Sequence, residues 1–250
     1  MSPYLGSYEL TPPEIAEQLI INGFSPCPLE PMSKAITIKN WTKKEFNPNQ
    51  FTQMNGVGIK TGNGLVAIDI DIYDPKISDE ITRAAFQNLG PTLARVGEAP
   101  KIALLYRSAA INSKSTSKVQ PTGEAPDNKV EAIEVLASGQ QLVVAAIHPN
   151  TKRPYSWNGA TPWSPSTGHI EKLPLIDASN WQKFQSSISH LLAQDSFTQH
   201  AVVKQPETEN RRVGNDTPST AEVQEILSYI PSTLDYDTWI LITMGLKSLG

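Results

Sequence analysis

The 250-residue sequence predicts an α+β or α/β fold, in which strands and helices are mixed along roughly the first 200 residues. The main evidence is a set of short apolar runs that are typical of buried strands. They cover residues 65–71, 101–107, 132–137 and 141–147. Helix-like segments lie among these runs, and with 39% hydrophobic residues the chain can bury a sizeable core.

The composition excludes several classes of protein. The formal net charge is −4, so contact with a polyanion would need local basic patches. Cys27 is the only cysteine and there are four histidines, which excludes an internal disulfide, argues against a zinc site and suits a reducing cytosol. No apolar run reaches about 18 residues and no signal peptide is evident, so we expect a cytoplasmic protein with no membrane partner.

The N-terminal part predicts one helix and one glycine-rich turn region. The helix covers residues 11–23, with a threonine cap, two prolines in its first turn and a glycine at its end. The turn region, 56–64, lacks the ending of a Walker loop, and it precedes a strand where a Rossmann loop would follow one. We nevertheless expect its backbone N–H groups and Lys60 to approach a nucleotide.

The middle of the chain predicts strands, two helices and a long loop. After strand 65–71 we expect a helix over 74–90, with Ser78 as its cap. The polar, turn-rich segment 110–129 is predicted to be a loop, and 178–194 an amphipathic helix.

The chain is expected to contain one complete domain and the start of another. Residues 1–202 form the first domain in this prediction. Residues 203–219 carry almost no large apolar side chains and predict a linker. Residues 220–250 predict two helices that are too short to form a core alone, so we expect them to begin a second, helical domain.

Two aspartates stand inside the strand predicted over residues 65–71. Because side chains alternate along a strand, Val66, Ile68 and Ile70 share one face. Asp69 and Asp71 share the other face, about 6–7 Å apart. One interpretation is a wet face with two solvated carboxylates. The other is a divalent cation between them, which removes their repulsion; oxygen ligands favour Mg²⁺ or Mn²⁺.

A third carboxylate is needed to hold two ions. Glu134 lies between Ile133 and Val135 in its predicted strand, and we expect it to join the aspartates if that strand lies beside theirs. Glu131 stands at the edge of the same strand and is interpreted as solvated.

Several cationic and aromatic residues are candidates for binding a nucleotide. Lys101 opens a predicted strand and Arg95 precedes it, so they either meet a triphosphate or mark an exposed strand end. His148 either polarises a phosphate or a primer end, or is a loop histidine bonded to backbone. Tyr155 and Trp157 either stack on a base or belong to the core.

Three segments in this order resemble a known family: GIKTGNGLVAIDID, RVGEAPKIALLYR and IEVLASGQQLVVAAIHPNTKRPYSW. Over roughly residues 10–200, the chain resembles the bifunctional DNA primase/polymerase (Prim-Pol) domain of the archaeo-eukaryotic primase superfamily, typical of phages and plasmids. The tail, AEVQEILSYIPSTLDYDTWILITMGLKSLG, resembles the opening helices of the C-terminal primase helical domain.

The resemblance implies an α+β fold with an RNA-recognition-like sheet, a second α/β subdomain and a site between them. The first family motif, an acid pair on a strand, falls on Asp69 and Asp71, and the third, an apolar residue followed by an acid, on Ile133 and Glu134. The second motif is usually Ser-x-His, but here the sequence reads Ala-Pro-Lys, so Lys101 stands in place of the histidine and is expected to contact phosphate.

The function implied is template-directed nucleotidyl transfer by a DNA primase/polymerase that replicates a phage or plasmid in a bacterial cytoplasm. Three acids would hold two Mg²⁺ or Mn²⁺ ions and no zinc. The expected partners are single-stranded DNA template, dNTPs or NTPs, and a helicase. Two alternatives remain open: a metal-dependent nuclease that uses the same acids, and a non-catalytic replication adaptor that binds single-stranded DNA and a helicase.

Overall fold

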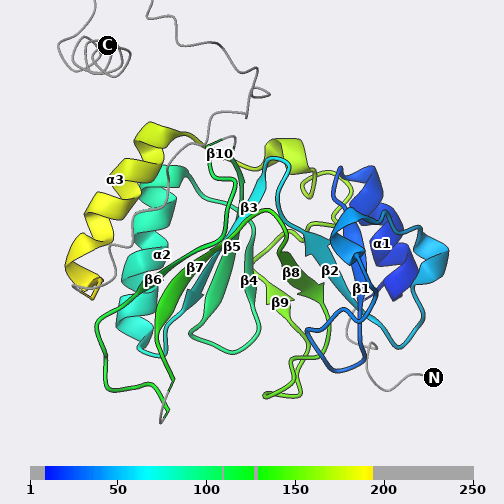
Figure 1. Ribbon diagram of the computed structural model, residues 1–250, viewed down its shortest axis with the longest axis horizontal. Helices are drawn as coiled ribbons and strands as arrows, with labels where there is room; N and C mark the ends of the chain where they lie inside the picture. Colours follow the sequence, from blue (N-terminus) through cyan, green and yellow to red (C-terminus); the bar gives the residue numbers. More distant parts are fainter. Residues whose placement is uncertain (1–8, 109, 127–128, 194–250) are drawn as a thin grey trace, which may run out of the picture. The chain divides into compact units, whose positions relative to one another are not determined.

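The computed structural model describes residues 9–108, 110–126 and 129–193 (Figure 1). These residues belong to a compact unit that spans Met1–Val203. The linker predicted over 203–219 and the helices predicted over 220–250 lie outside the described residues. Among the described helices, none combines the length and the hydrophobicity that crossing a membrane requires.

A seven-stranded sheet forms the larger part of the fold. Its strand order is β6-β7-β3-β5-β4-β9, and β10 adds to β5 as a parallel neighbour. The other pairings in this sheet are antiparallel. The strands are β3 (Leu65–Asp71), β4 (Ala94–Val96), β5 (Ile102–Ser108), β6 (Ser115–Lys118), β7 (Ala132–Leu136), β9 (Ser156–Trp157) and β10 (Leu175–Ile176).

Two helices cover one face of this sheet, α2 (Pro75–Leu89) and α3 (Ala178–Ile188) (Figure 1). They pack on the branched side chains of β3, because every second residue of that strand points to this face. Asp74 caps α2 by accepting hydrogen bonds from the next backbone N–H groups. The cap predicted at Ser78 is therefore wrong: Ser78 is buried within the helix, and its hydroxyl donates to the carbonyl of Pro100 at 2.7 Å.

A smaller sheet with the order β1-β2-β8 packs with helix α1 at the other end of the unit (Figure 1). Its elements are β1 (Pro26–Leu29), β2 (Gly56–Lys60), β8 (Gln141–Ala145) and α1 (Pro12–Ile21). Four short 3-10 helices complete the described structure: Trp41–Lys43, Pro48–Gln50, Ile170–Lys172 and Ser189–Leu191. The predicted α+β fold class is confirmed.

Three local predictions differ from the structure. The first five residues of the segment predicted as turns form strand β2, and only 61–64 turn. Glycine suits β2 because a Cβ atom at Gly56 would lie 2.9 Å from the Cβ atom of Ala146. The segment 110–129, predicted as loop, contains β6, and β1 was not predicted at all. These strands form through partners distant in sequence, which local patterns do not reveal.

The two sheets meet over only part of the second face of β3. Leu65 and Ala67 on β3, with Ala103 and Leu105 on β5, join the core shared with the small sheet. The next residue of β3 on this face is Asp69. The acidic residues of β3 therefore begin where the cover provided by the small sheet ends.

The core face of β3 should dominate stability. We expect Ile68→Ala, which truncates a fully buried side chain, to lower the free energy of unfolding by about 2–5 kcal/mol, measured by urea denaturation. Ile21→Ala is the matched control, because Ile21 is 61% exposed, and it should change the value by less than about 0.5 kcal/mol. Equal losses for both variants would contradict this account of the core.

Candidate active site

One row of side chains crosses the open face of the large sheet. Glu134 on β7 lies directly opposite Asp69 on β3. On the other side of Asp69 the register partner is Ala103, which in turn lies opposite Arg95 on β4. Residues directly opposite each other in an antiparallel pair share a face and have Cβ atoms about 4.5–5.5 Å apart. The structure therefore brings together Glu134, Asp69 and Arg95.

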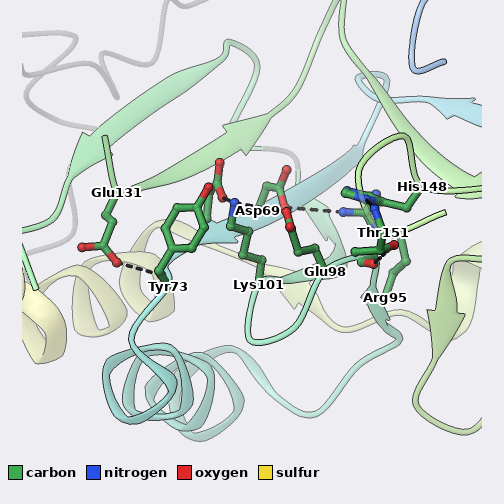
Figure 2. A network of polar contacts seen from close by, with 10 residues as sticks. Asp69, Tyr73, Arg95, Glu98, Lys101, Glu131, His148 and Thr151 are labelled. Atoms are coloured by element: carbon green, nitrogen blue, oxygen red, sulfur yellow. Dashed lines mark hydrogen bonds and ion pairs between the residues drawn. The ribbon is translucent and has the colours of Figure 1, made fainter. Parts of the chain in front are cut away.

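Asp71 follows on the same face of β3 and contacts Lys101. The two atoms Lys101 Nζ and Asp71 Oδ1 are 2.8 Å apart, although the angles of this contact are not those of a hydrogen bond. Lys101 Nζ also lies 3.6 Å from Glu98 Oε2 and 3.6 Å from the centre of the Tyr73 ring. Figure 2 shows Lys101 between Tyr73 and Glu98, beside Asp69.

Each acid of the site is paired with a different cation. Arg95 Nη2 lies 3.5 Å from Asp69 Oδ1, and Lys114 Nζ lies 3.0 Å from Glu134 Oε1. With the Lys101 contact, these pairs offset the repulsion among carboxylates on one small surface. Lys114 was not predicted as a partner of Glu134, because the segment that forms its neighbouring strand β6 was predicted to be loop.

Burial and neighbouring charges change the acidity of this group. Burial, together with repulsion from Asp71 and Glu134, raises the pKa of Asp69, and the nearby Arg95 only partly opposes it. Partial burial lowers the pKa of Lys101, but its contacts with Asp71 and Tyr73 outweigh burial and raise it on balance. Lys101 therefore keeps its positive charge at neutral pH.

A cavity of about 130 Å³ lies beside the two aspartates. Four cationic residues and three acids line it, with polar and aromatic groups between them: Lys34, Arg95, Lys101, Lys129, Asp69, Asp71, Glu98, His148, Asn150 and Tyr155. Arg95 is buried and donates from Nη1 to the Val143 carbonyl at 3.1 Å. Its Nε is buried and has no hydrogen-bond partner among the described residues.

His148 lines the same cavity and is held by backbone. Its Nδ1 accepts a hydrogen bond from the backbone N–H of Thr151 at 3.3 Å, so Nε2 carries the proton of the neutral ring. Burial and the nearby Lys34 lower the pKa of His148, which keeps the ring neutral at physiological pH. His148 can therefore offer a hydrogen bond, and not a positive charge, to a ligand.

A close approach of chain segments shapes this end of the cavity. A Cβ atom at Gly97 would lie 2.3 Å from the Tyr155 ring and 2.9 Å from His148 Cδ2. Tyr155 is 2% exposed, and the indole nitrogen of Trp157 donates to the Val144 carbonyl at 3.0 Å. Both aromatic side chains therefore pack within the fold, as the core interpretation expected.

Lys60 is not brought to the acids. It lines a separate cavity of about 410 Å³, formed by the turns at one end of the small sheet. Its Nζ contacts the carbonyl oxygen of Lys44 and lies 5.8 Å from the centre of the Phe46 ring. The structure gives Lys60 a role in holding the 44–46 segment.

Glu131 was interpreted as solvated, and this is wrong. The residue is 4% exposed and accepts hydrogen bonds from three donors in two loops. Its Oε1 accepts from the backbone N–H of Tyr73 at 2.7 Å, and its Oε2 accepts from Thr122 N and Oγ1 at 3.1 and 2.7 Å. Glu131 thus holds the turn that carries the Tyr73 ring to Lys101 (Figure 2).

The donor chemistry of the site fits a hard divalent cation. Asp69, Asp71 and Glu134 offer only oxygen atoms, which Mg²⁺ and Mn²⁺ prefer. Asp71 Oδ1 is buried and lacks a hydrogen bond to any described residue, and repulsion contributes to the raised pKa of Asp69. Within the described ranges, however, no three His, Cys, Asp or Glu side chains already surround one point as ligands. Binding an ion would require these carboxylates to turn from their cationic partners.

Comparison with known proteins identifies the family. The family described as "Bifunctional DNA primase/polymerase, N-terminal" (Prim-Pol) matches residues 16–180. This range is more than half of the chain and includes every residue of the row and the cavity, so the chain belongs to the Prim-Pol family. A comparison with curated proteins found no match.

Family membership sets the class of chemistry. It implies a nucleotidyltransferase of the primase/polymerase type, with a DNA template and nucleotide substrates. The family generally uses divalent metal ions. The antiparallel sheet with helices on one face is consistent with a Prim-Pol core.

The Glu131 contacts generate a pH-dependent prediction. Burial would raise the pKa of Glu131, but the hydrogen bonds from Thr122 and Tyr73 outweigh burial and lower it. Ionised Glu131 therefore stabilises the fold above its unfolded pKa of about 4.3, and this stabilisation is lost as pH falls through the lower folded value. We expect Glu131→Gln to lower the free energy of unfolding by about 2 kcal/mol at neutral pH.

Chemical denaturation at several pH values measures this effect. The difference between wild type and Glu131→Gln should begin to shrink as the pH falls below the unfolded pKa of about 4.3, and should disappear once the pH is below the lower folded pKa as well. Glu171→Gln, at an exposed position, should be neutral throughout. A difference that is constant from acid to neutral pH would show that the charge of Glu131 is unimportant.

Proposed function

We propose that this protein is a template-directed DNA primase/polymerase that transfers nucleotides by a two-metal reaction in the replication of a phage or plasmid. The observation that carries the proposal is the register of β3 and β7. It places Glu134 opposite Asp69, with Asp71 on the same open face and a cation-lined cavity beside them. Family membership supports the class of reaction.

The three acids would hold the metal ions. Asp69, Asp71 and Glu134 would bind two Mg²⁺ or Mn²⁺ ions, with no zinc. When bound, such ions activate the attacking hydroxyl and stabilise the charge of the leaving pyrophosphate. The protein contributes an open strand face that presents the carboxylates from two paired strands, so that little of the backbone has to move.

The cavity would receive the triphosphate of the incoming dNTP or NTP. Lys101 and Arg95 line the cavity and supply positive charge to it. His148 would donate from Nε2 to a phosphate oxygen as a neutral group. Lys101 stands where the family usually has histidine, and before the ions bind its contact with Asp71 raises its pKa, so that it is charged when the nucleotide arrives.

Other parts of the chain have proposed roles in replication. From the sequence, the lysines at residues 34–44 and 114–118, with Lys152 and Arg153, are candidates to contact the backbone of a single-stranded DNA template. We keep this role for the lysines at 34–44 and for Lys152 and Arg153. The segment 220–250 would begin a primase helical domain after the linker, and a helicase would be a partner. The site of action would be the cytoplasm of a bacterial host.

Substitution of the acids tests the proposal. Asp69→Asn and Glu134→Gln remove ligand charge while preserving shape, so nucleotide incorporation on a primed template should fall at least about 100-fold, equivalent to about 3 kcal/mol. The measurement is extension of a labelled primer with Mg²⁺ or Mn²⁺. Asp79→Asn is the matched control, since Asp79 is exposed on α2 and pairs with Arg83. Full activity in both acid variants would refute the assignment.

Calorimetry tests ligand binding without turnover. Wild-type protein should bind a nucleoside triphosphate together with Mn²⁺, and Lys101→Ala should weaken this binding by about tenfold or more, because a charged phosphate contact is lost. Lys172→Ala, at an exposed position remote from the cavity, should bind as wild type does. Absence of any triphosphate binding would favour a replication adaptor, and degradation of DNA without incorporation would favour a nuclease.

A further inference from the structure

A second polar surface flanks the three acids on the side away from the cavity. It belongs to β6, the edge strand of the large sheet, whose sequence Ser-Thr-Ser-Lys contains no apolar residue. Thr116 lies opposite Glu134, and Lys118 lies opposite Ala132, the register partner of Asp71. Thr116 and Lys118 therefore share the open face with the acids.

Lys114 continues this surface, because every second residue of a strand points to the same face. It lies two residues before Thr116, and its Nζ is 3.0 Å from Glu134 Oε1. Lys114, Thr116 and Lys118 are all exposed, because neither the small sheet nor the two helices cover this part of the face. We call these three residues the β6 strip.

The acids thus stand between two cationic surfaces. Asp69 and Asp71 lie on β3, which has β5 on one side and β7 on the other. The cavity cations Arg95 and Lys101 come from β4 and the residue preceding β5, on one side. The β6 strip comes from beyond β7, on the other side.

The chemistry of nucleotidyl transfer places the leaving pyrophosphate and the attacking hydroxyl on opposite sides of the three acids. The attacking and leaving oxygens lie roughly in line through the phosphorus atom. The 3′-oxygen bonds to the α-phosphorus while the bond to the bridging oxygen breaks; pyrophosphate leaves and the hydroxyl proton passes to solvent. If the cavity cations hold the pyrophosphate, the 3′-hydroxyl must enter from the side of Glu134, where the β6 strip lies.

We propose that the β6 strip binds the primer, the strand whose 3′-hydroxyl is extended, and not the template. This inference rests on the proposed function. Alternate residues of a β-strand are about 6.8 Å apart, and Lys114 and Lys118 are separated by two such steps. They would therefore contact two phosphates at separate positions along the extended primer. The Thr116 hydroxyl between them, which donates to Glu134 Oε1 at 3.3 Å in this structure, would turn to donate to a third phosphate oxygen.

Site-specific crosslinking identifies the strand that the strip contacts. Cys27 is the only cysteine of the sequence and is fully buried, so Thr116→Cys introduces one accessible thiol for a photo-activated crosslinker. The probe is a primer–template DNA with each strand labelled separately, mixed with the full chain in the absence of metal and triphosphate. Crosslinks should form to the last few nucleotides of the primer. Lys183→Cys, exposed on the helix-covered face, should give few crosslinks.

Binding measurements provide a second readout. Lys114→Ala combined with Lys118→Ala should weaken primer–template binding by about tenfold in fluorescence anisotropy and reduce the salt slope by about two. Binding of unprimed single-stranded template should change much less. The matched control is Lys76→Ala with Lys183→Ala, which removes two exposed lysines from α2 and α3 and should leave both affinities unchanged.

Two results would overturn the inference. One is crosslinking from position 116 to the template, or no more crosslinking than from position 183. The other is an equal loss of primed and unprimed binding in the Lys114/Lys118 variant. Either result leaves the proposed function standing, because that is tested by incorporation in the Asp69 and Glu134 variants.

Discussion

Electrostatic repulsion among Asp69, Asp71 and Glu134 is the constraint on which the arrangement of this site depends. Three carboxylates on neighbouring positions of one sheet face destabilise the fold unless opposite charges lie close by. Arg95, Lys101 and Lys114 satisfy this requirement, one for each acid. The same repulsion, with burial, raises the pKa of Asp69. A divalent cation would relieve this repulsion more fully, which is the physical basis of the proposed metal site.

The rigidity of the site follows from the two faces of β3. Ile68 and Ile70 are completely buried against the helices, and the intervening Asp69 projects from the opposite face of the same strand. Pairing with β5 and β7 fixes the position of Asp69 along the sheet, and pairing with β7 fixes that of Asp71. The partial cover by the small sheet then leaves the acids accessible while the residues before them are packed. A single strand, β3, therefore contributes both to the packed core and to the face that a ligand can reach.

The sequence predictions were most accurate where a local rule applied. Alternation along one strand placed Asp69 and Asp71 on one face, and the position of Glu134 inside another apolar run made it a candidate to join them. The error at Glu131, and the position of Lys60 away from the acids, have a different origin. Whether a carboxylate is solvated or accepts hydrogen bonds from two loops depends on segments distant in sequence, and so does whether a lysine faces the acids or another cavity.

By itself, therefore, the sequence determined the fold class, the strand that carries the acid pair and the resemblance to a primase/polymerase. These depend on side-chain alternation and on short motifs, which act over a few residues. Only the tertiary structure decided that β7 lies beside β3, that β6 forms the edge beyond it and that the small sheet stops before Asp69. Strand order and packing depend on contacts between distant segments, because the free energy of pairing comes from side-chain burial across strands and not from local propensity.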